Sequence, residues 1–169
     1  MADRRFSLNV PVPGRVQRIA SDLAPQLSGF DLIRRRHSLV CKRLGAGTPA
    51  RLADRARRAL ANAPAAEARV SGIETFMNPP TGSAPVVYLA VESPGLHRLH
   101  ERLCESFDPV PDLEGEGYVP HVTLARGGDA ETARRLAARD VDPVTWTVSE
   151  VHLWDARDRE TVRRFPLPG

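Results

Sequence analysis

The order of predicted elements repeats once along the chain, and this repeat limits the fold more than any single motif does. Apolar spacing in the first half predicts strand, helix, strand, helix and strand over residues 5–12, 14–28, 37–44, 50–63 and 66–76. The second half predicts the same order over residues 86–92, 95–107, 118–126, 129–139 and 144–154. Two copies of a β-α-β-α-β plan, about 80 residues apart, predict an α+β fold with two related lobes facing one another.

The length fits this plan. A chain of 169 residues suits one domain, or two small lobes that share a core. We expect a single domain over 1–169 whose lobes are not strictly sequential, with a first half of about 1–80 and a second half of about 81–169. Residues 108–117, "DPVPDLEGEG", are acidic and glycine-rich, and we expect a loop there that does not pack. The final "ETVRRFPLP" can form a last strand.

Composition narrows the class of protein. Hydrophobic residues make up 41% of the chain and charged residues 27%, which is ordinary for a globular protein. There is no apolar run long enough to span a membrane, and the first ten residues lack the apolar core of a signal peptide. We therefore expect a cytoplasmic monomer with no membrane contact. Cys41 and Cys104 have neither disulfide nor metal spacing, so we expect buried thiols, no metal and no cofactor.

The positive charge is carried by arginine. The net charge is +3, and Lys42 is the only lysine among 24 basic residues. The planar guanidinium group holds a phosphate through two hydrogen bonds, which lysine cannot do. Surface arginines are usually solvated, so this composition is only a weak indication of a phosphate-bearing partner.

The stretch "YVPHVTLARGG" carries the strongest motif. On a strand His121 and Thr123 share one face, while Val122 and its apolar neighbours point to the other. His37 occupies the matching slot of the first half, since 121 − 37 = 84 is close to the repeat length. A lone histidine on a strand is more often structural, but two in matching slots predict one groove lined by both.

Two imidazoles across a groove suit acid–base chemistry at a phosphate. A neutral imidazole accepts a proton from the attacking water, and a protonated one donates to the leaving oxygen. The Thr123 hydroxyl can donate to a phosphoryl oxygen, where negative charge develops. Arg126 and Lys42, at the ends of the two strands, can add positive charge.

"PHVTLAR" at 120–126 resembles the second His-x-Thr-x signature of the two-histidine phosphoesterases, in their 2′-5′ RNA ligase and cyclic phosphodiesterase branch. The resemblance extends over nearly the whole chain, through "HSLVCKRLG", "PVVYLAVESPGLHRLHERL" and "VSEVHLW". It implies two pseudo-symmetric lobes with antiparallel sheets facing across a central cleft and helices outside. It also implies metal-free hydrolysis of 2′,3′-cyclic phosphates, on RNA ends or small cyclic nucleotides, to 2′-phosphates, with His37 and His121 as the catalytic pair.

The first signature departs from the family pattern. The sequence has His37, Ser38 and Leu39, so the hydroxyl comes one residue early. A β-bulge could return Ser38 to the groove face. Alternatively the site works with one hydroxyl, and Lys42 or Arg43 supplies the missing charge. Two other functions stay open on this fold: a non-catalytic module that binds RNA or nucleotides, and a 2′-5′ RNA ligase.

The remaining polar and aromatic residues have ordinary explanations. We expect packing or solvated roles for His97, His100, His152, Trp146 and Trp154, with base stacking by a tryptophan as the alternative. The run "RRR" at 34–36 is either solvated or a basic rim for RNA. Tyr118 either stacks on a base or forms a wall of the cleft.

Overall fold

The computed structural model describes residues 4–168. Nine strands pair in these residues: β1 Phe6–Pro11, β2 Leu32–Ile33, β3 Ser38–Gly45, β4 Ala66–Phe76, β5 Val86–Glu92, β6 His121–Arg126, β7 Val144–Val148, β8 Glu150–Asp155 and β9 Glu160–Pro166. The α-helices are α1 Gly14–Leu23, α2 Pro49–Ala59, α3 Pro94–Cys104 and α4 Ala130–Ala137. Two 3₁₀ helices, η1 Ala24–Leu27 and η2 Gly115–Gly117, complete the regular structure.

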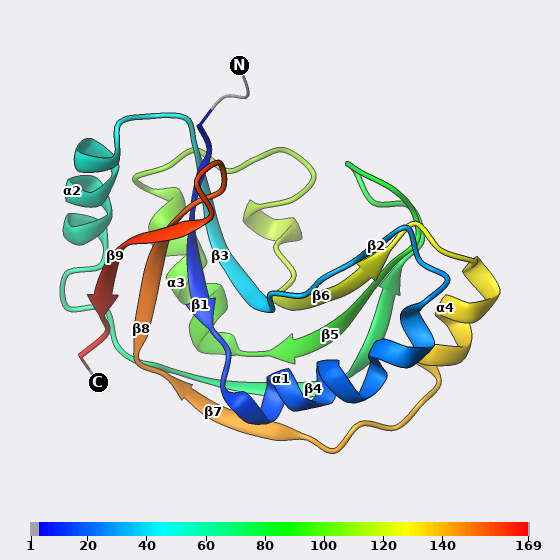
Figure 1. The fold of residues 1–169 in the computed structure, drawn as a ribbon. Helices are drawn as coiled ribbons and strands as arrows, with labels where there is room; N and C mark the ends of the chain where they lie inside the picture. The colour runs from blue at the N-terminus through cyan, green and yellow to red at the C-terminus, as the bar shows by residue number, and fades with distance from the viewer. Residues whose placement is uncertain (1–3, 169) are drawn as a thin grey trace.

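The strand order is symmetric about its middle. It runs β7-β4-β5-β6-β3-β1-β8-β9, with β2 added beside β6, and every pairing is antiparallel. The halves of the chain exchange strands, because β4 pairs with β5 and β8 pairs with β1. The two sides of the sheet join where Leu39 of β3 faces Val122 of β6. Figure 1 shows the sheet curling between α2 and α4 at opposite ends of the molecule. The α+β prediction with antiparallel sheets is confirmed.

Local sequence explains where the helices begin. The Ser93 side chain accepts a hydrogen bond from the Leu96 N–H at 3.1 Å and starts α3, with Pro94 in its first turn. Asp129 caps α4 in the same way by accepting from the Thr132 N–H at 3.0 Å. In the described part of the chain, no helix is long and apolar enough to cross a membrane.

Two predicted elements are divided in the structure, whereas the others differ from their predicted ranges only at the ends. The helix expected over 14–28 ends at Leu23 and continues as the 3₁₀ turn η1, because Pro25 lacks an N–H and crowds the preceding turn. The strand expected over 144–154 is two strands that separate at Ser149. Its first part, β7, pairs with β4, whereas β8 pairs with β1 on the other side of the sheet. The segment 144–155 therefore contributes one strand to each side of the sheet.

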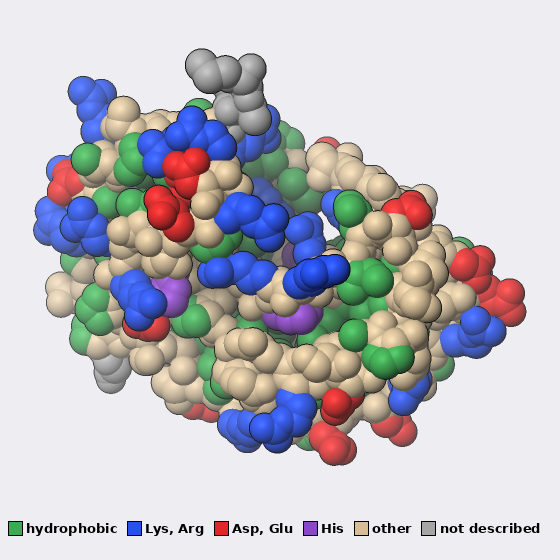
Figure 2. All heavy atoms as spheres, in the orientation of Figure 1, with side chains coloured by type: hydrophobic (Ala, Val, Ile, Leu, Met, Phe, Trp, Pro, Cys, Tyr) green, Lys and Arg blue, Asp and Glu red, His purple; other side chains and the backbone are tan. Residues whose placement is uncertain are grey.

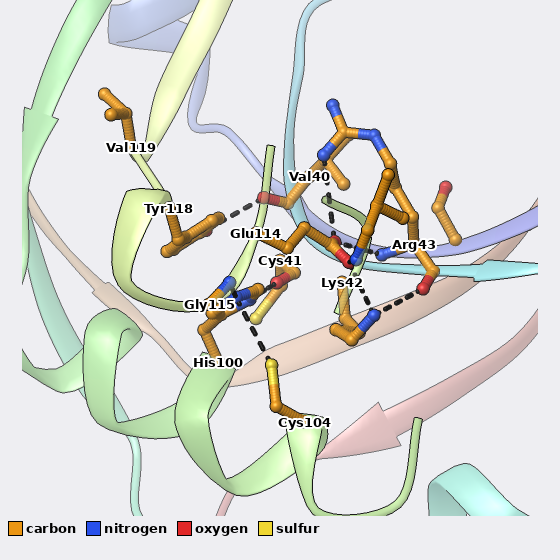
Figure 3. Close-up of polar contacts among 12 residues, drawn as sticks. Val40, Cys41, Lys42, Arg43, His100, Cys104, Glu114, Gly115, Tyr118 and Val119 are labelled. Atoms are coloured by element: carbon orange, nitrogen blue, oxygen red, sulfur yellow. Dashed lines mark hydrogen bonds and ion pairs between the residues drawn. The ribbon is translucent and has the colours of Figure 1, made fainter. Parts of the chain in front are cut away.

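A buried ion pair fixes the loop at 108–117 to β3, contrary to the expectation that this loop does not pack. The side chains of Lys42 and Glu114 are both 0% exposed, and Lys42 Nζ lies 2.6 Å from Glu114 Oε1 (Figure 3). The ammonium group also donates to the Arg43 carbonyl at 2.7 Å and the Asp108 carbonyl at 3.0 Å. All three of its donors are used, which is what makes burial of the charge tolerable.

Glu114 is equally well satisfied. Its carboxylate also accepts from the Arg43 N–H at 2.7 Å and the Val110 N–H at 3.0 Å. Burial raises the pKa of this carboxyl, but the hydrogen bonds from Lys42, Arg43 and Val110 outweigh burial and bring the pKa below its usual 4.5. The sequence-based expectation that Lys42 adds charge to the groove is therefore wrong, because its charge is neutralised inside the protein.

His100 supports the same loop from α3. Its Nδ1 lies 2.7 Å from the Cys41 carbonyl, and its Nε2 accepts from the Gly115 N–H at 2.9 Å. One neutral tautomer satisfies both contacts. The ring stacks on Tyr118 at 3.9 Å between centroids, so the packing role expected for His100 is confirmed.

We expect Glu114→Ala to lower the free energy of unfolding by about 3–5 kcal/mol, because it leaves the Lys42 ammonium buried without its carboxylate. Chemical denaturation monitored by circular dichroism measures this. Glu116→Ala, at an exposed residue of the same turn, is the matched control and should cost little. A loss below about 1 kcal/mol in Glu114→Ala would show that the pair does not hold the loop.

Candidate functional site

His121 and Thr123 lie on the same face of β6 and line one cavity, as the alternation predicted. Val122 and Leu124 point into the core and are almost fully buried. Beyond Thr123 the strand contains a bulge, because Tyr88 of β5 pairs with Thr123 while the preceding Val87 pairs with Ala125. Leu124 and Ala125 are consequently both buried, and Arg126 returns to the groove. The bulge therefore places a histidine, a threonine and an arginine on one surface.

β3 has the same bulge at the matching point. Leu8 of β1 pairs with Lys42 and Asn9 pairs with Val40, so Cys41 is skipped. Cys41 and Lys42 are both buried, and Arg43 returns to the groove. The symmetric strand order and the paired bulges align β6 with β3 residue by residue. His121 corresponds to Ser38, Thr123 to Val40, and Arg126 to Arg43.

The placement of His37 is a correction to the sequence-based prediction. His37 precedes β3, which begins at Ser38, and the position that matches His121 is Ser38. His37 does not line the cavity of His121. It lines one cavity with Leu27 and Phe30, and another with His152 that shares Ser38 and Trp154 with the groove. Ser38 already faces the groove on a regular part of the strand, since Leu39 is buried, so it needs no bulge to reach it.

The residues around His121 line a cavity of about 370 Å³. A second cavity of about 620 Å³ adjoins it, and Arg34, Val40 and Thr123 line both. We call the two together the groove. Figure 2 shows arginine side chains, coloured blue, crossing this face of the molecule, with histidine atoms visible beneath them. The charged side chains that line the first cavity are Arg34, Arg43, Arg126 and Asp112.

His121 is held as a neutral base with one free nitrogen. Its Nδ1 donates to the Val119 carbonyl at 2.6 Å, and its ring packs edge-on against Phe76 and Tyr88. Nε2 has no hydrogen-bond partner among residues 4–168. Burial lowers the pKa of His121 below 6.5, and the charges of Arg43 and Arg126 lower it further, while the Val119 bond opposes them. Near neutral pH, Nε2 therefore carries a lone pair.

Arg126 supplies positive charge with no acidic side chain to neutralise it in the described chain. It donates to the Thr81 carbonyl at 3.2 Å, and its buried Nε has no hydrogen-bond partner there. Burial, and then the nearby charge of Arg34, lower the pKa of Arg126, although it stays protonated. Gly82, with φ at +78°, packs against the guanidinium, and a side chain at Gly82 would collide with it. An anion would relieve this unbalanced charge.

The other predicted residues have clear positions. Tyr118 donates to the Val40 carbonyl at 2.8 Å and is buried against His100, which makes it a wall of the cavity and leaves no face for a base. Burial raises the pKa of Tyr118 well above 10, so it stays protonated. Thr123 lines both cavities, and Ser38 lines the second. Arg34, which the sequence left as either solvated or part of a basic rim, lines both cavities.

One acidic cluster in the described chain has ligand atoms close enough to hold a metal ion: Asp155, Asp158 and Glu160. Asp155 already accepts from Arg4 Nε at 2.6 Å and from the Arg157 N–H at 3.0 Å. These contacts account for the cluster, which we assign to the β8–β9 turn.

Comparison with known proteins identifies the family. The model of the 2′-5′ RNA ligase superfamily matches residues 35–160, and the chain therefore belongs to this superfamily of two-histidine phosphoesterases. A search of curated proteins finds no match.

Solved structures show the same fold. TT0787 of Thermus thermophilus is 23% identical, with a TM-score of 0.67 and 98% of each chain covered. E. coli LigT complexed with phosphate is 18% identical, with a TM-score of 0.66 and 98% of each chain covered. E. coli LigT complexed with 3′-AMP is 19% identical, with a TM-score of 0.67, covering 98% of this chain and 99% of that one.

We expect the cavity to bind inorganic phosphate through Arg126. Arg126→Ala should weaken binding about tenfold or more, since a hydrogen bond to a charged group contributes about 1.5–3 kcal/mol. Isothermal titration calorimetry with phosphate measures this. Arg69→Ala, at an exposed arginine of β4 outside the groove, should bind as the wild type does. Equal affinity in both variants would show that the anion binds elsewhere.

Proposed function

We propose that this chain binds nucleotides or RNA ends by a phosphate held at His121, Thr123, Arg43 and Arg126, and that it hydrolyses 2′,3′-cyclic phosphates without a metal. The observation that carries the proposal is the free Nε2 of His121 in a cavity that also contains Arg126, whose charge no acidic side chain of the described chain neutralises. Membership of the superfamily supports it, as does the existence of LigT structures with phosphate and with 3′-AMP.

The chemistry follows from the neutral state of His121. Nε2 accepts a proton from a water molecule, whose oxygen forms a new bond to phosphorus. The bond from phosphorus to O3′ breaks, and O3′ takes a proton, which leaves a 2′-phosphate. Arg43, Arg126 and the Thr123 hydroxyl hold the phosphoryl oxygens, on which negative charge increases in the transition state.

Ser38 makes this a one-histidine site. It lies on β3 where pseudo-symmetry would place a second imidazole, so a general acid is missing on that side. A serine hydroxyl can donate a hydrogen bond to O3′, but its proton is too weakly acidic to be transferred near neutral pH. The proton must then come from water. Since a positioned general acid contributes about 10²–10⁴-fold, turnover is expected to be slow.

A second candidate function is recognition without turnover. The observation that favours it is the pair Ser38 and Val40, which replaces both the histidine and the threonine that β6 carries at the matching positions. On this account the protein holds a phosphate-ended nucleotide or RNA and releases it unchanged.

We expect purified protein to convert 2′,3′-cyclic AMP slowly to 2′-AMP, and His121→Ala to abolish the reaction because it removes the base. Chromatographic separation of the products measures both. Turnover in His121→Ala equal to that of the wild type would contradict the proposal. Tight binding of the cyclic nucleotide with no product would instead establish the second candidate.

Restoring the missing half of the site should accelerate hydrolysis. Ser38→His with Val40→Thr gives β3 the pattern of β6, and we expect the rate to rise about tenfold or more as a general acid is added. Val40→Thr alone is the matched control, and it should change the rate little. A double variant that folds, binds the cyclic nucleotide and is no faster than the wild type would show that β3 and β6 do not face the same phosphate.

The pH dependence of kcat/KM should have one limb. The neutral imidazole of His121 is the active form, and its pKa lies below 6.5. We therefore expect kcat/KM to rise as pH increases through this lowered pKa and to stay level at higher pH. A series of initial rates in overlapping buffers tests this. A fall in kcat/KM between about pH 7 and 8 would reveal a second titrating group acting as an acid.

A further inference from the structure

The groove continues beyond the phosphate site into a cavity that the proposed chemistry does not use. This second cavity measures about 620 Å³ and adjoins the first at Thr123, Val40 and Arg34. Its lining contains no acidic side chain among the described residues. The charged side chains that line it are Arg34, Arg35, Arg36 and Arg159.

These arginines are free to take an external anion. All four are exposed, and none forms an ion pair with a carboxylate within residues 4–168. In the same structure Arg4, Arg57 and Arg58 do pair with carboxylates. A row of unpaired arginines leading away from one phosphate site matches the regular negative charge of a nucleic acid backbone.

Trp154 adds a flat surface to this row. It lies on β8, half-buried, and lines the same cavity as Ser38 and Thr123. The guanidinium of Arg36 lies over the indole ring, with its central carbon 3.7 Å from the ring centroid. A guanidinium held on an aromatic ring keeps its other face exposed, and unpaired bases stack on such planes. Basic grooves with stacking surfaces are typical of proteins that bind single strands.

We propose that the second cavity holds the single-stranded RNA segment next to the bound end phosphate. Arg34, Arg35 and Arg159 contact its backbone phosphates, and one base stacks on Arg36, which Trp154 holds in place. This inference rests on the proposed function for the position of the end phosphate, and it makes a short RNA strand, in preference to a mononucleotide, the ligand that fills the groove.

The test compares two ligands that share an end. Affinities for 3′-AMP and for a short single-stranded RNA ending in a 3′-phosphate are measured by fluorescence anisotropy competition at one fixed salt concentration. We expect the RNA to bind more tightly than 3′-AMP. Trp154→Ala and Arg36→Ala should each weaken RNA binding about five- to a hundredfold, the range typical of base stacking, and leave 3′-AMP unaffected.

Conservative and unrelated variants separate stacking from damage. Trp154→Phe keeps an aromatic ring and should retain most of the RNA affinity. Arg36→Lys keeps the charge but loses the plane, and it should weaken RNA binding nearly as much as Arg36→Ala. Arg69→Ala, outside the groove, should behave as the wild type. Since Arg36 is exposed, its variants test the proposal even if Trp154→Ala does not fold.

Several outcomes would overturn the proposal. They are RNA binding no tighter than 3′-AMP, no effect of the Arg36 variants on RNA, and equal weakening of both ligands. An acidic peptide of similar charge that competes as well as the RNA would also overturn it, since the groove would then recognise charge alone. Hydrolysis of 2′,3′-cyclic AMP is measured in a separate assay. If the RNA binds as expected but 2′,3′-cyclic AMP is not converted, the proposed hydrolysis is wrong and the proposed RNA site is still supported.

Discussion

The buried contact between Lys42 and Glu114 is the interaction on which the site depends. It joins β3 to the loop at 108–117, with all three ammonium donors satisfied. That loop leads into Tyr118 and Val119, and the Val119 carbonyl fixes the tautomer of His121. The same carboxylate holds the Arg43 N–H, and therefore the β3 residue whose side chain returns to the groove. The same carboxylate lies 3.7 Å from the Arg43 guanidinium, so this buried ion pair positions both the His121 ring and one arginine of the groove.

The two sides of the sheet are built alike, but they are not equally equipped. Matching bulges in β3 and β6 bring an arginine to each side of the groove. The backbones of β3 and β6 are therefore related by the symmetry of the fold. The side chains have not, because Ser38 and Val40 lie opposite His121 and Thr123. On the proposed function, a symmetric cleft with one imidazole would bind a phosphate from two sides but transfer protons on one side only, so it would bind the ligand well and turn it over slowly.

The sequence was sufficient for the fold and for one half of the site. Alternating and helical spacing placed most elements, and the face shared by His121 and Thr123 follows from strand geometry alone. It could not place His37, because whether a residue starts a strand depends on pairing, and pairing starts at Ser38. It also misplaced Lys42. Alternation from Ser38 and Val40 would put Lys42 in the groove, but the bulge at Cys41 turns it into the core. The carboxylate that makes its burial possible comes from Glu114, 72 positions away in a loop that looked too polar to pack.

On the proposed account, an RNA strand whose end phosphate lies at His121 would continue over Ser38 toward Arg36 and Trp154, along a wall without acidic groups in the described chain. A crystal structure with 2′-AMP tests the arrangement. It should show the phosphate between Arg43 and Arg126, hydrogen-bonded to His121 Nε2, with Ser38 across the groove and His37 outside it. A phosphate bound by His37 and His152, with His121 unoccupied, would contradict the assignment of the site.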